Sequence, residues 1–513
     1  MPLFLIGFMA AGKTSVGREL AASTNRTFVD LDDAVAAMGE PVAQLVARDL
    51  AEFRRREAAA LATLLDADAV IATGGGAATY GDNLDRMRAA GLVVALGVDV
   101  GEARRRAGDA TSRPLLANAD QLAVERAPVY RRAHAVVDTM GKSIAAVVDD
   151  VKHVERVWRS LPGSDRDVTI VALGDRSYAV HVGRQLDMDL VMSQLGSPTK
   201  LLVITDKNVA RYALVDDPIV IEPGEASKSF DTYQAICNEC VKRGLDRGSA
   251  ILALGGGVVG DLAGFVASTL YRGIAVVQVP TTLVAMTDAA IGGKTAIDLP
   301  AGKNLVGAFW QPRLVACATD TLATLPARER RAGFGELWKY AMLDGKDLWS
   351  AVAACAPWAA GPDGTAPPPA LRTVIDRAIA YKAAIVGRDE RELTGHRALL
   401  NLGHTVGHAI ETASGMLHGE AVGLGLVAAC RVSAAILGTR DLSSEVAAAL
   451  ASSGLPSDPG PWFTDEVLSR IKVDKKRIGA NLRFVAVREV GACEPVEIAV
   501  TELSRILRPV LGA

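Results

Sequence analysis

The feature that most constrains the fold is a glycine loop between an apolar run and a helical pattern at the start of the chain. Residues 3–7 are apolar, and the stretch from Gly7 to Thr14 fits the pattern G-x-x-x-x-G-K-[ST]. In such a loop backbone N–H groups surround phosphate oxygens, the lysine adds positive charge, and the hydroxyl can hold Mg²⁺. A strand that turns through glycine into a helix is typical of a parallel sheet covered by helices. The pattern predicts an α/β domain that binds a nucleotide, and it leaves the phosphoryl acceptor open.

Length and charge restrict the class of protein. At roughly 150 residues per domain, a chain of 513 residues holds about three domains. Half of the residues are hydrophobic and the formal net charge is -3, which provides several cores and no basic surface for nucleic acid or acidic membranes. We therefore expect a soluble globular protein that binds no nucleic acid.

The sequence also predicts a cytoplasmic location. The apolar N-terminus lacks a basic segment before it, and no uninterrupted apolar run reaches the length of a membrane span. The six cysteines are scattered along the chain, which favours free thiols in a reducing compartment. We expect no signal peptide and no membrane span.

The order of strand and helix patterns predicts the domains. Strand–turn–helix alternation runs from the N-terminus to a last helix near Trp158, and a Ser/Pro/Gly/Asp stretch follows it. A second alternating series follows and implies parallel strands with helical crossovers, after which Ala/Leu-rich helical periodicity dominates. The predicted bounds are 1–160 for the first domain, 161–165 for a linker, 166–325 for a second α/β domain and 326–513 for a mostly helical domain.

Three further groups of residues after the first glycine loop point to a ligand. Asp30 and Asp32 close a predicted strand, residues 52–57 carry arginines on a predicted helix, and Gly74 to Gly76 end an apolar run. Each has an ordinary structural reading as a helix cap, a solvated face or a tight turn. Together they suit a small polyhydroxy acid, because carboxylates accept from hydroxyls, arginines bind a carboxylate and glycines permit close approach.

With the segments 111–116 and 126–130, residues 1 to about 158 resemble shikimate kinase. The resemblance implies a P-loop NTPase-type parallel sheet domain that uses ATP with Mg²⁺. It implies that Asp32 contacts shikimate and orients or deprotonates its hydroxyl, that Lys13 is catalytic, that Thr14 holds the metal, and that Arg113 reaches the nucleotide from a mobile lid. The other implied shikimate contacts are Arg54, Gly75 and Arg126, and the implied nucleotide loop is Gly7, Ala10, Ala11, Gly12, Lys13, Thr14 and Ser15.

Two departures from that family raise an alternative. Ala10 stands where the family usually has glycine, and the segment between Leu116 and Arg126 is shorter than usual. A methyl group at position 10 is harmless at negative φ and costs on the order of 1 kcal/mol or more at positive φ. The alternative is a nucleotide-binding module without turnover.

A second glycine loop lies in the middle of the chain. Residues 254–261, Leu-Gly-Gly-Gly-Val-Val-Gly-Asp, follow an apolar strand pattern and open a helix, which suits a pyrophosphate on a helix N-terminus. The basic and hydroxyl residues of the next fifty positions favour a phosphorylated or polyhydroxylated ligand.

Histidines cluster in the last third of the chain. Four of the seven, His396, His404, His408 and His418, fall within 23 positions. The four-residue spacing of His404 and His408 places both on one helix face, so local reasoning pairs them on one metal, although core or surface histidines remain an alternative. Zinc could take Glu336 and two histidines and keep open positions for substrate hydroxyls.

Residues 165–513 resemble 3-dehydroquinate synthase, and the ordered motifs that carry the likeness are 223–228, 255–261, 292–298, 302–304, 336–339 and 401–420. The resemblance implies a Rossmann-like α/β NAD-binding domain followed by a mostly α-helical metal-binding domain. It implies that Glu336, His404 and His418 hold Zn²⁺ (or Co²⁺), which overrules the local pairing. His408 then lies on the substrate phosphate and assists proton movement.

The same resemblance supplies two larger sets of residues. The implied NAD contacts are Asp206, Asn208, Glu225, Lys228, Gly256, Gly257, Val258, Gly260, Asp261, Thr281, Thr282, Lys294, Lys303, Thr321 and Thr324. The implied substrate contacts are Arg272, Asp288, Lys294, Lys303, Asn304, Lys339, Arg397 and Asn401, with Lys294 and Lys339 catalytic. Arg272 is expected from a neighbouring subunit, because such enzymes are typically homodimers. Lys475 or Lys476 also reaches the substrate, and the choice between them stays open.

Taken together, the two resemblances imply a bifunctional enzyme of aromatic amino acid biosynthesis. The first half would phosphorylate shikimate to shikimate 3-phosphate with ATP. The second would cyclise DAHP to 3-dehydroquinate with release of phosphate, while NAD is regenerated in every turnover. The alternative for the second half is a related sugar-phosphate cyclase or a metal-dependent polyol dehydrogenase, and the lysines around a phosphate weigh against a simple dehydrogenase.

Overall fold

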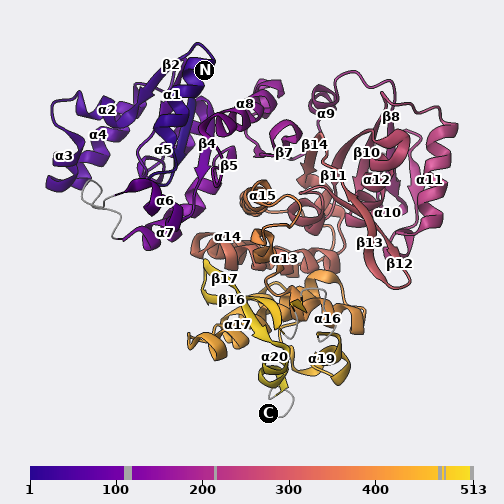
Figure 1. The fold of residues 1–513 in the computed structure, drawn as a ribbon. Helices are drawn as coiled ribbons and strands as arrows, with labels where there is room; N and C mark the ends of the chain where they lie inside the picture. The colour runs from indigo at the N-terminus through magenta and orange to yellow at the C-terminus, as the bar shows by residue number, and fades with distance from the viewer. Residues whose placement is uncertain (109–117, 213–215, 472–476, 479–480, 509–513) are drawn as a thin grey trace. The chain divides into compact units, whose positions relative to one another are not determined.

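Apolar strands that alternate with helices build the N-terminal part of the protein, shown in a computed structural model that describes residues 1–108, 118–212, 216–471, 477–478 and 481–508 (Figure 1). By its internal contacts the chain divides into two compact units, Met1–His181 with Val386–Arg388, and Val182–Ile385 with Asp389–Ala513. The domain bounds drawn from the sequence stay a prediction.

The first unit contains a parallel sheet in the order β2-β3-β1-β4-β5. Its strands are β1 (Leu3–Gly7), β2 (Thr27–Asp30), β3 (Ala69–Ala72), β4 (Leu92–Gly97) and β5 (Ala135–Asp138), followed by the short β6 (Thr169–Val171) and β7 (Tyr178–Gly183). Its helices are α1 (Lys13–Ser23), α2 (Leu31–Ala36), α3 (Val42–Arg48), α4 (Leu50–Ala62), α5 (Asn83–Ala90), α6 (Val100–Ala107), α7 (Ala119–Arg131) and α8 (Ile144–Ser160). The predicted α/β fold of this part is confirmed.

The central strands β1, β3 and β4 of this sheet are apolar because helices pack on them. Every residue of β1 and of β3 is buried, as a central parallel strand requires. Since the strands are parallel, the segments after Gly7, Asp30 and Ala72 leave the sheet at the same edge. That edge is where open α/β sheets bind ligands.

The second unit begins with another parallel sheet, in the order β14-β11-β10-β8-β9. Its strands are β8 (Leu201–Asp206), β9 (Ile219–Ile221), β10 (Ala250–Gly255), β11 (Ala275–Pro280) and β14 (Leu314–Ala318). Its helices are α9 (Met188–Leu195), α10 (Lys207–Ala210), α11 (Phe230–Lys242) and α12 (Gly257–Thr269). The strands β12 (Lys294–Leu299) and β13 (Gly302–Phe309) form a separate antiparallel ribbon. The Rossmann-like prediction is confirmed in its α/β class and parallel sheet.

The rest of the second unit is mainly helical, as predicted. Its helices are α13 (Ala327–Asp344), α14 (Lys346–Ala360), α15 (Ala370–Arg388), α16 (His404–Ser414), α17 (His418–Leu437), α18 (Ser443–Ser452), α19 (Asp465–Ile471) and α20 (Val500–Leu507). The sequence analysis missed a small antiparallel sheet of β15 (Arg477–Ile478), β16 (Asn481–Glu489) and β17 (Ala492–Ala499).

Helix α17 is the core of this helical part. It is long and apolar enough to cross a membrane by length and composition, yet 72% of its most apolar window is buried inside the protein. It packs against α13, α16, α18 and β16. Burial by these neighbours accounts for its apolar sequence, which is weak evidence for a membrane span.

Two candidate active sites

The first site is a glycine loop between β1 and α1. Gly7 has φ 133°, and a Cβ there would lie 2.6 Å from the carbonyl oxygen of Leu96, so the position requires glycine. The Nζ of Lys13 donates to the carbonyl oxygens of Gly7 and Phe8 at 2.9 Å each. The Oγ1 of Thr14 donates to Oδ2 of Asp30 at 2.9 Å. The loop thus presents an amine, a hydroxyl and a carboxylate where a nucleotide phosphate and its Mg²⁺ would bind.

The structure answers the question that Ala10 raises. Ala10 has φ 56°, in the left-handed region. A residue with a Cβ is strained there by roughly 1 kcal/mol. The loop therefore keeps the backbone path of a glycine although the residue is alanine.

We predict that Ala10→Gly raises the free energy of unfolding of the N-terminal unit by roughly 0.5–1 kcal/mol, because glycine adopts positive φ without strain. Ala11→Gly is the matched control. Ala11 is buried and outside the left-handed region, so its change to glycine should destabilise the unit by about 1 kcal/mol. Urea unfolding of the three proteins measures both values, and a less stable Ala10→Gly variant would contradict the strain at this position.

Two aspartates lie at the end of β2. Asp30 caps α2 by accepting from the backbone N–H of Asp32 at 3.1 Å, while its other oxygen accepts from Thr14. Oδ1 of Asp32 is buried and has no hydrogen-bond partner among the residues that the structure describes. Burial, and then the charge of Asp30, raise the pKa of Asp32, against the opposing charges of Lys13 and Arg54. Asp32 is therefore a carboxyl group of raised basicity beside the phosphate loop.

An arginine and a fully buried glutamate face this carboxyl group. Nη1 of Arg54 donates to Oε2 of Glu57 at 2.5 Å. A Cβ on Gly74 would lie 2.4 Å from Oε1 of Glu57, and one on Gly76 would lie 2.1 Å from Nη2 of Arg54. The glycines are thus needed for these side chains to approach the strand end. Sequence reasoning missed the role of Glu57, although its three-residue spacing from Arg54 on one helix is a usable signal.

Helix α7 completes the site. Nη1 of Arg126 lies 3.5 Å from the position a Cβ would take on Gly75, and the hydroxyl of Tyr130 donates to the carbonyl oxygen of Gly75. Burial raises the pKa of Tyr130 to about 12. The structure thus brings Arg126 and Gly75 to the cluster of Asp32 and Arg54, whereas Arg113 lies outside the described residues.

The second site is built around one buried carboxylate on α13. Oε1 of Glu336 lies 3.3 Å from Nε2 of His404 and 3.1 Å from Nε2 of His418. Glu336 is 0% exposed, and one donor atom from each residue falls within 4.8 Å of the others. His408, on the same helix as His404, is exposed and groups with Glu411 and His418. The set around the buried Glu336 is therefore the one implied by the resemblance, and it differs from the local pairing of His404 with His408.

The protonation states of Glu336 and His404 fit a metal. Burial lowers the pKa of His404, which favours the neutral imidazole that can bind a cation. Burial opposes the ionisation of Glu336, but the charges of Lys339 and His404 hold the pKa of that carboxyl well below its usual range. Burial opposes the protonation of His418, but its hydrogen bonds with Glu336 and Glu411 raise its pKa to about 10, so a metal at this ring would displace a proton. One carboxylate and two imidazoles form a donor set of catalytic zinc, with coordination positions left for a substrate.

Glycines set the distances between the metal-binding helices. A Cβ on Gly335 would lie 1.9 Å from the carbonyl oxygen of Gly419, and one on Gly419 would lie 1.7 Å from that of Ala332. A Cβ on Gly425 would lie 1.9 Å from the carbonyl oxygen of Gly403, which joins α17 to the start of α16. Gly335, Gly403 and Gly419 each adjoin one of the three candidate ligands, so backbone contacts fix the geometry of the donors.

Two buried lysines share one aspartate beside the metal donors. Oδ1 of Asp288 accepts from Nζ of Lys382 at 2.8 Å and from the hydroxyl of Tyr340 at 3.0 Å, and it lies 3.8 Å from Nζ of Lys339. Lys339 also pairs with Glu336. Burial lowers the pKa of Lys382 to about 8, against the opposing charge of Asp288. Sequence reasoning missed Lys382, although a lysine in the apolar stretch 378–386 is a signal of a buried charge.

The remaining predicted substrate cations are partnered by acidic residues or carbonyl groups. Lys294 pairs with Glu392, Nζ of Lys303 donates to Oε1 of Glu411 at 2.8 Å, and Nη1 of Arg397 donates to the carbonyl oxygen of Glu390 at 2.6 Å. A bound anion would therefore replace protein oxygens at these cations. Sequence reasoning missed Glu392 and assigned no role to Glu411.

Other predicted substrate residues occupy different places. Asn401 ends a 3₁₀ turn, His396–Asn401, before α16. Arg272 is exposed on the turn after α12 with φ 68°, next to Tyr271 with φ 52°. Lys475 and Lys476 lie outside the described residues.

The predicted NAD residues follow the carboxyl ends of the parallel strands. Asp206 caps α10 through the N–H groups of Asn208 and Val209 after β8, and Gly257 opens α12 after β10. Thr281 and Thr282 follow β11, and Thr321 and Thr324 follow β14. This edge is where doubly wound sheets bind dinucleotides, with a helix N-terminus facing the pyrophosphate.

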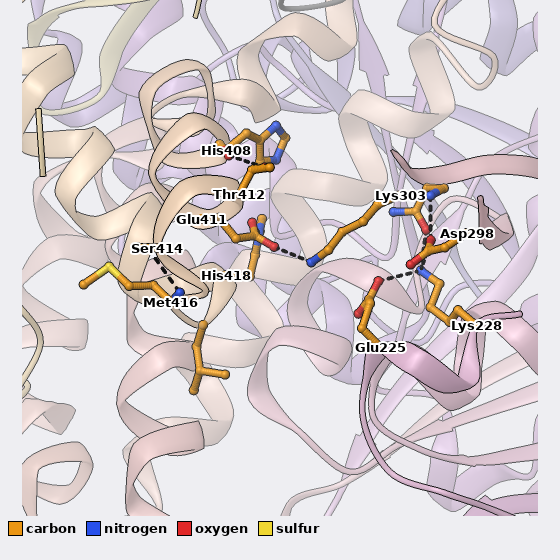
Figure 2. A network of polar contacts seen from close by, with 12 residues as sticks. Glu225, Lys228, Asp298, Lys303, His408, Glu411, Thr412, Ser414, Met416 and His418 are labelled. Carbon is orange, nitrogen blue, oxygen red and sulfur yellow. Dashed lines mark hydrogen bonds and ion pairs between the residues drawn. The ribbon is translucent and has the colours of Figure 1, made fainter. Parts of the chain in front are cut away.

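A buried lysine organises the next part of that edge. Nζ of Lys228 donates to Oδ2 of Asp261 at 2.8 Å and to Oδ1 of Asn304. It also lies 3.3 Å from Oε1 of Glu225, a pair shown in Figure 2. Burial raises the pKa of Asp261 to about 6, against the charge of Lys228. The structure thus brings four predicted cofactor or substrate residues into one polar network.

Comparisons with known proteins agree with these two sites. Residues 9–155 match the family model for shikimate kinase, residues 218–332 that for the N-terminal part of 3-dehydroquinate synthase, and residues 333–477 that for its C-terminal part. The 3-dehydroquinate synthase of Caulobacter vibrioides is 42% identical over 346 residues, 63% of this chain and 92% of the relative. That of Lactiplantibacillus plantarum is 44% identical over 326 residues, 60% of this chain and 87% of the relative.

Solved structures of related cyclases are similar to the second unit. A 2-deoxy-scyllo-inosose synthase complexed with carbaglucose-6-phosphate, NAD+ and Co²⁺ has a TM-score of 0.59 and 26% identity, over 67% of this chain and 99% of that one. The 2-epi-5-epi-valiolone synthase of Streptomyces hygroscopicus subsp. jinggangensis 5008, with NAD+ and Zn²⁺, has a TM-score of 0.55 and 25% identity, over 65% and 96% of the two chains. By these matches the chain belongs to the 3-dehydroquinate synthase family, and it carries a shikimate kinase domain ahead of the synthase.

Proposed function

We propose that the two candidate sites carry out two reactions of aromatic amino acid biosynthesis in one chain. The first is the transfer of a phosphoryl group from ATP to shikimate, and the second is the cyclisation of DAHP to 3-dehydroquinate. The observation that carries the synthase assignment is the set of buried Glu336, buried His404 and half-buried His418 beside Lys339, in a region that is 42% identical to a 3-dehydroquinate synthase.

In the kinase site, catalysis depends on the positions and charges of a few side chains. Lys13 and the N–H groups of the loop bind the phosphates of ATP, and Thr14 with Asp30 would hold Mg²⁺. Arg54 and Arg126 bind the carboxylate of shikimate, since guanidinium groups match that shape. Asp32, whose pKa is raised by burial, accepts the proton of the attacking hydroxyl.

In the synthase site, Glu336, His404 and His418 would hold Zn²⁺. Zinc held there would polarise a substrate hydroxyl, and bound NAD would supply reversible hydride transfer. When the substrate binds, its phosphate and carboxylate replace the protein oxygens that pair with Lys294, Lys303 and Arg397. His408, exposed near Glu411 and His418, moves a proton at the phosphate end. Lys339 and Lys382, held by Asp288, orient the ring oxygens by donating to them.

A homodimer in the cytoplasm fits this proposal. Arg272 is exposed at positive φ, where a bulky residue is strained, and such strain is typical of functional positions. A second subunit would take this arginine into its own substrate site. All six cysteines are free thiols, which suits a reducing compartment.

A related cyclase or a polyol dehydrogenase is the second candidate for this half, since the similar solved structures are cyclases of other substrates. A dehydrogenase would accumulate NADH with a polyol substrate, whereas the synthase returns its hydride. The lysines 294, 303, 339 and 382 favour a phosphorylated substrate.

We predict that His404→Ala abolishes zinc retention, because it removes a donor from a three-residue set. His408→Ala is expected to keep its zinc and to turn over more slowly, because His408 lies outside the set around the buried Glu336. Elemental analysis of the purified proteins, with phosphate release from DAHP, measures both effects. Equal metal content in the wild type and the His404→Ala variant would contradict the ligand assignment.

A further inference from the structure

One carboxylate joins a candidate metal ligand to a candidate substrate ligand. Glu411 lies on α16, and Figure 2 shows its side chain between His418 and Lys303. Its Oε2 lies 2.9 Å from Nδ1 of His418, and its Oε1 accepts from Nζ of Lys303 at 2.8 Å. Each oxygen of this carboxylate therefore has its own partner.

The ring of His418 is held at both nitrogens. Its Nε2 lies 3.1 Å from Oε1 of Glu336, on the metal side, and its Nδ1 faces Glu411. A metal bound at Nε2 needs the lone pair of that nitrogen, so Nδ1 must carry the hydrogen and donate it to Glu411. Glu411 thus selects the tautomer and the orientation of the ring.

The other histidine of the set has a different partner. Nδ1 of His404 lies 3.0 Å from the carbonyl oxygen of Leu402 and donates to it, because a carbonyl oxygen only accepts. This partner is part of the backbone and does not respond to a ligand. The partner of His418 is a charged side chain that also pairs with a lysine of the substrate site.

Lys303 can change partner when a ligand binds. It lies on β13, its side chain is 54% exposed, and its neighbour Asn304 belongs to the polar network of Lys228. An anionic ligand that binds the ammonium group of Lys303 draws this cation away from the Glu411 carboxylate. The carboxylate then becomes a stronger acceptor for His418, and a stronger acceptor makes the imidazole a better metal ligand.

We propose that Glu411 is a positioning residue that couples the occupancy of Lys303 by substrate to the strength of the metal ligand His418. The inference rests on the proposed function of this site. It adds that metal affinity and substrate affinity depend on each other through one side chain, since such coupling is reciprocal.

The test is a measurement of metal affinity on the full chain. The metal is removed, and Zn²⁺ is titrated in competition with a chromophoric chelator for the wild type, Glu411→Gln, Lys303→Met and the double variant. Glu411→Gln should weaken Zn²⁺ binding roughly 10- to 100-fold. On the wild-type background, Lys303→Met should tighten Zn²⁺ binding. On the Glu411→Gln background, the same substitution should raise the Zn²⁺ affinity by less than half as much.

Glu420→Gln is the matched control. Glu420 is also a largely buried glutamate near His418, but its two oxygens accept from Arg328 at 2.9 Å each. Its Oε2 also accepts from the backbone N–H of Leu417 at 3.0 Å, and the amide oxygen of a glutamine can replace this acceptor. The Zn²⁺ affinity of the Glu420→Gln protein should stay within about threefold of the wild-type value if the hydrogen-bond partner of His418, rather than any nearby charge, determines the affinity. An equal loss in Glu420→Gln and Glu411→Gln would overturn the proposal, as would a Glu411→Gln variant that binds Zn²⁺ like the wild type.

Two further readouts separate positioning from folding and from the proposed function. The visible spectrum of the Co²⁺-loaded Glu411→Gln protein should shift, while thermal unfolding of the metal-free protein should match the wild type. If the Glu411→Gln protein fails to fold, the Zn²⁺ affinities of the wild type and the Lys303→Met protein still test the proposal. Weaker Zn²⁺ binding by the Lys303→Met protein would contradict the coupling. A wild type that binds Zn²⁺ but releases no phosphate from DAHP would instead contradict the proposed function.

Discussion

Replacement of Gly419 by alanine is expected to empty the metal site and to stop the synthase reaction. The new Cβ would lie 1.7 Å from the carbonyl oxygen of Ala332, so α17 and α13 must move apart. Glu336 and His418 stand beside this contact, and a shift of about 1 Å is enough to lose a catalytic geometry. We expect no retained zinc, at least a 100-fold loss of phosphate release and a destabilisation of about 3 kcal/mol or more.

A second glycine of the same helix provides the control. A Cβ on Gly423 would meet only the side chain of Leu450, at 3.0 Å, which can rotate away. Gly423→Ala should therefore keep its zinc with a modest loss of stability. Elemental analysis and thermal unfolding compare the two variants, and a Gly419→Ala protein with full zinc content would show that the helix contact does not set the site.

Replacement of Lys13 by alanine is expected to abolish the kinase reaction and to leave the synthase reaction intact. Lys13 is the loop amine that we propose binds the phosphates, and the loss of one such charge costs about 100-fold or more in rate. The measurement is shikimate-dependent ADP formation with MgATP. Lys152→Ala, which removes a surface lysine 3.9 Å from Asp149 in the same unit, should keep full activity. Unchanged ADP formation by the Lys13→Ala protein would refute the assignment of this loop.

Local patterns predicted the fold where strand, glycine and helix follow one another closely. The stretches around Gly7 and Gly257 are of this kind, because an apolar strand followed by a glycine turn leaves few alternatives. The ribbon of β16 and β17 was missed because its pairing connects residues such as Phe484 and Val496 across a turn, and Ala/Leu periodicity dominates the region before it.

The candidate sites were predictable where a motif carries the chemistry. Lys13, Thr14 and Glu336 stand in recognisable motifs, whereas Glu57 and Lys382 have roles that depend on tertiary contacts with Arg54 and Asp288. No periodicity along one segment reveals such partners.

The metal donors show the same limit. Helix spacing alone pairs His404 with His408, because both lie on one face. The structure instead gathers donors from α13, α16 and α17, which approach through glycine contacts that a single-helix argument does not contain. The strain at Ala10 is likewise a property of the folded loop, since the sequence left the sign of φ open.

Selective metal removal is expected to separate two independent activities of one chain. The purified protein is treated with a chelator, dialysed and given back Mg²⁺ alone, and both reactions are then measured in the same preparation. We predict shikimate-dependent ADP formation at the untreated rate, loss of phosphate release from DAHP, and recovery of that release with Zn²⁺ and NAD without net NADH. Absence of shikimate-dependent ADP formation, or phosphate release that survives metal removal, would contradict the proposal of two independent activities.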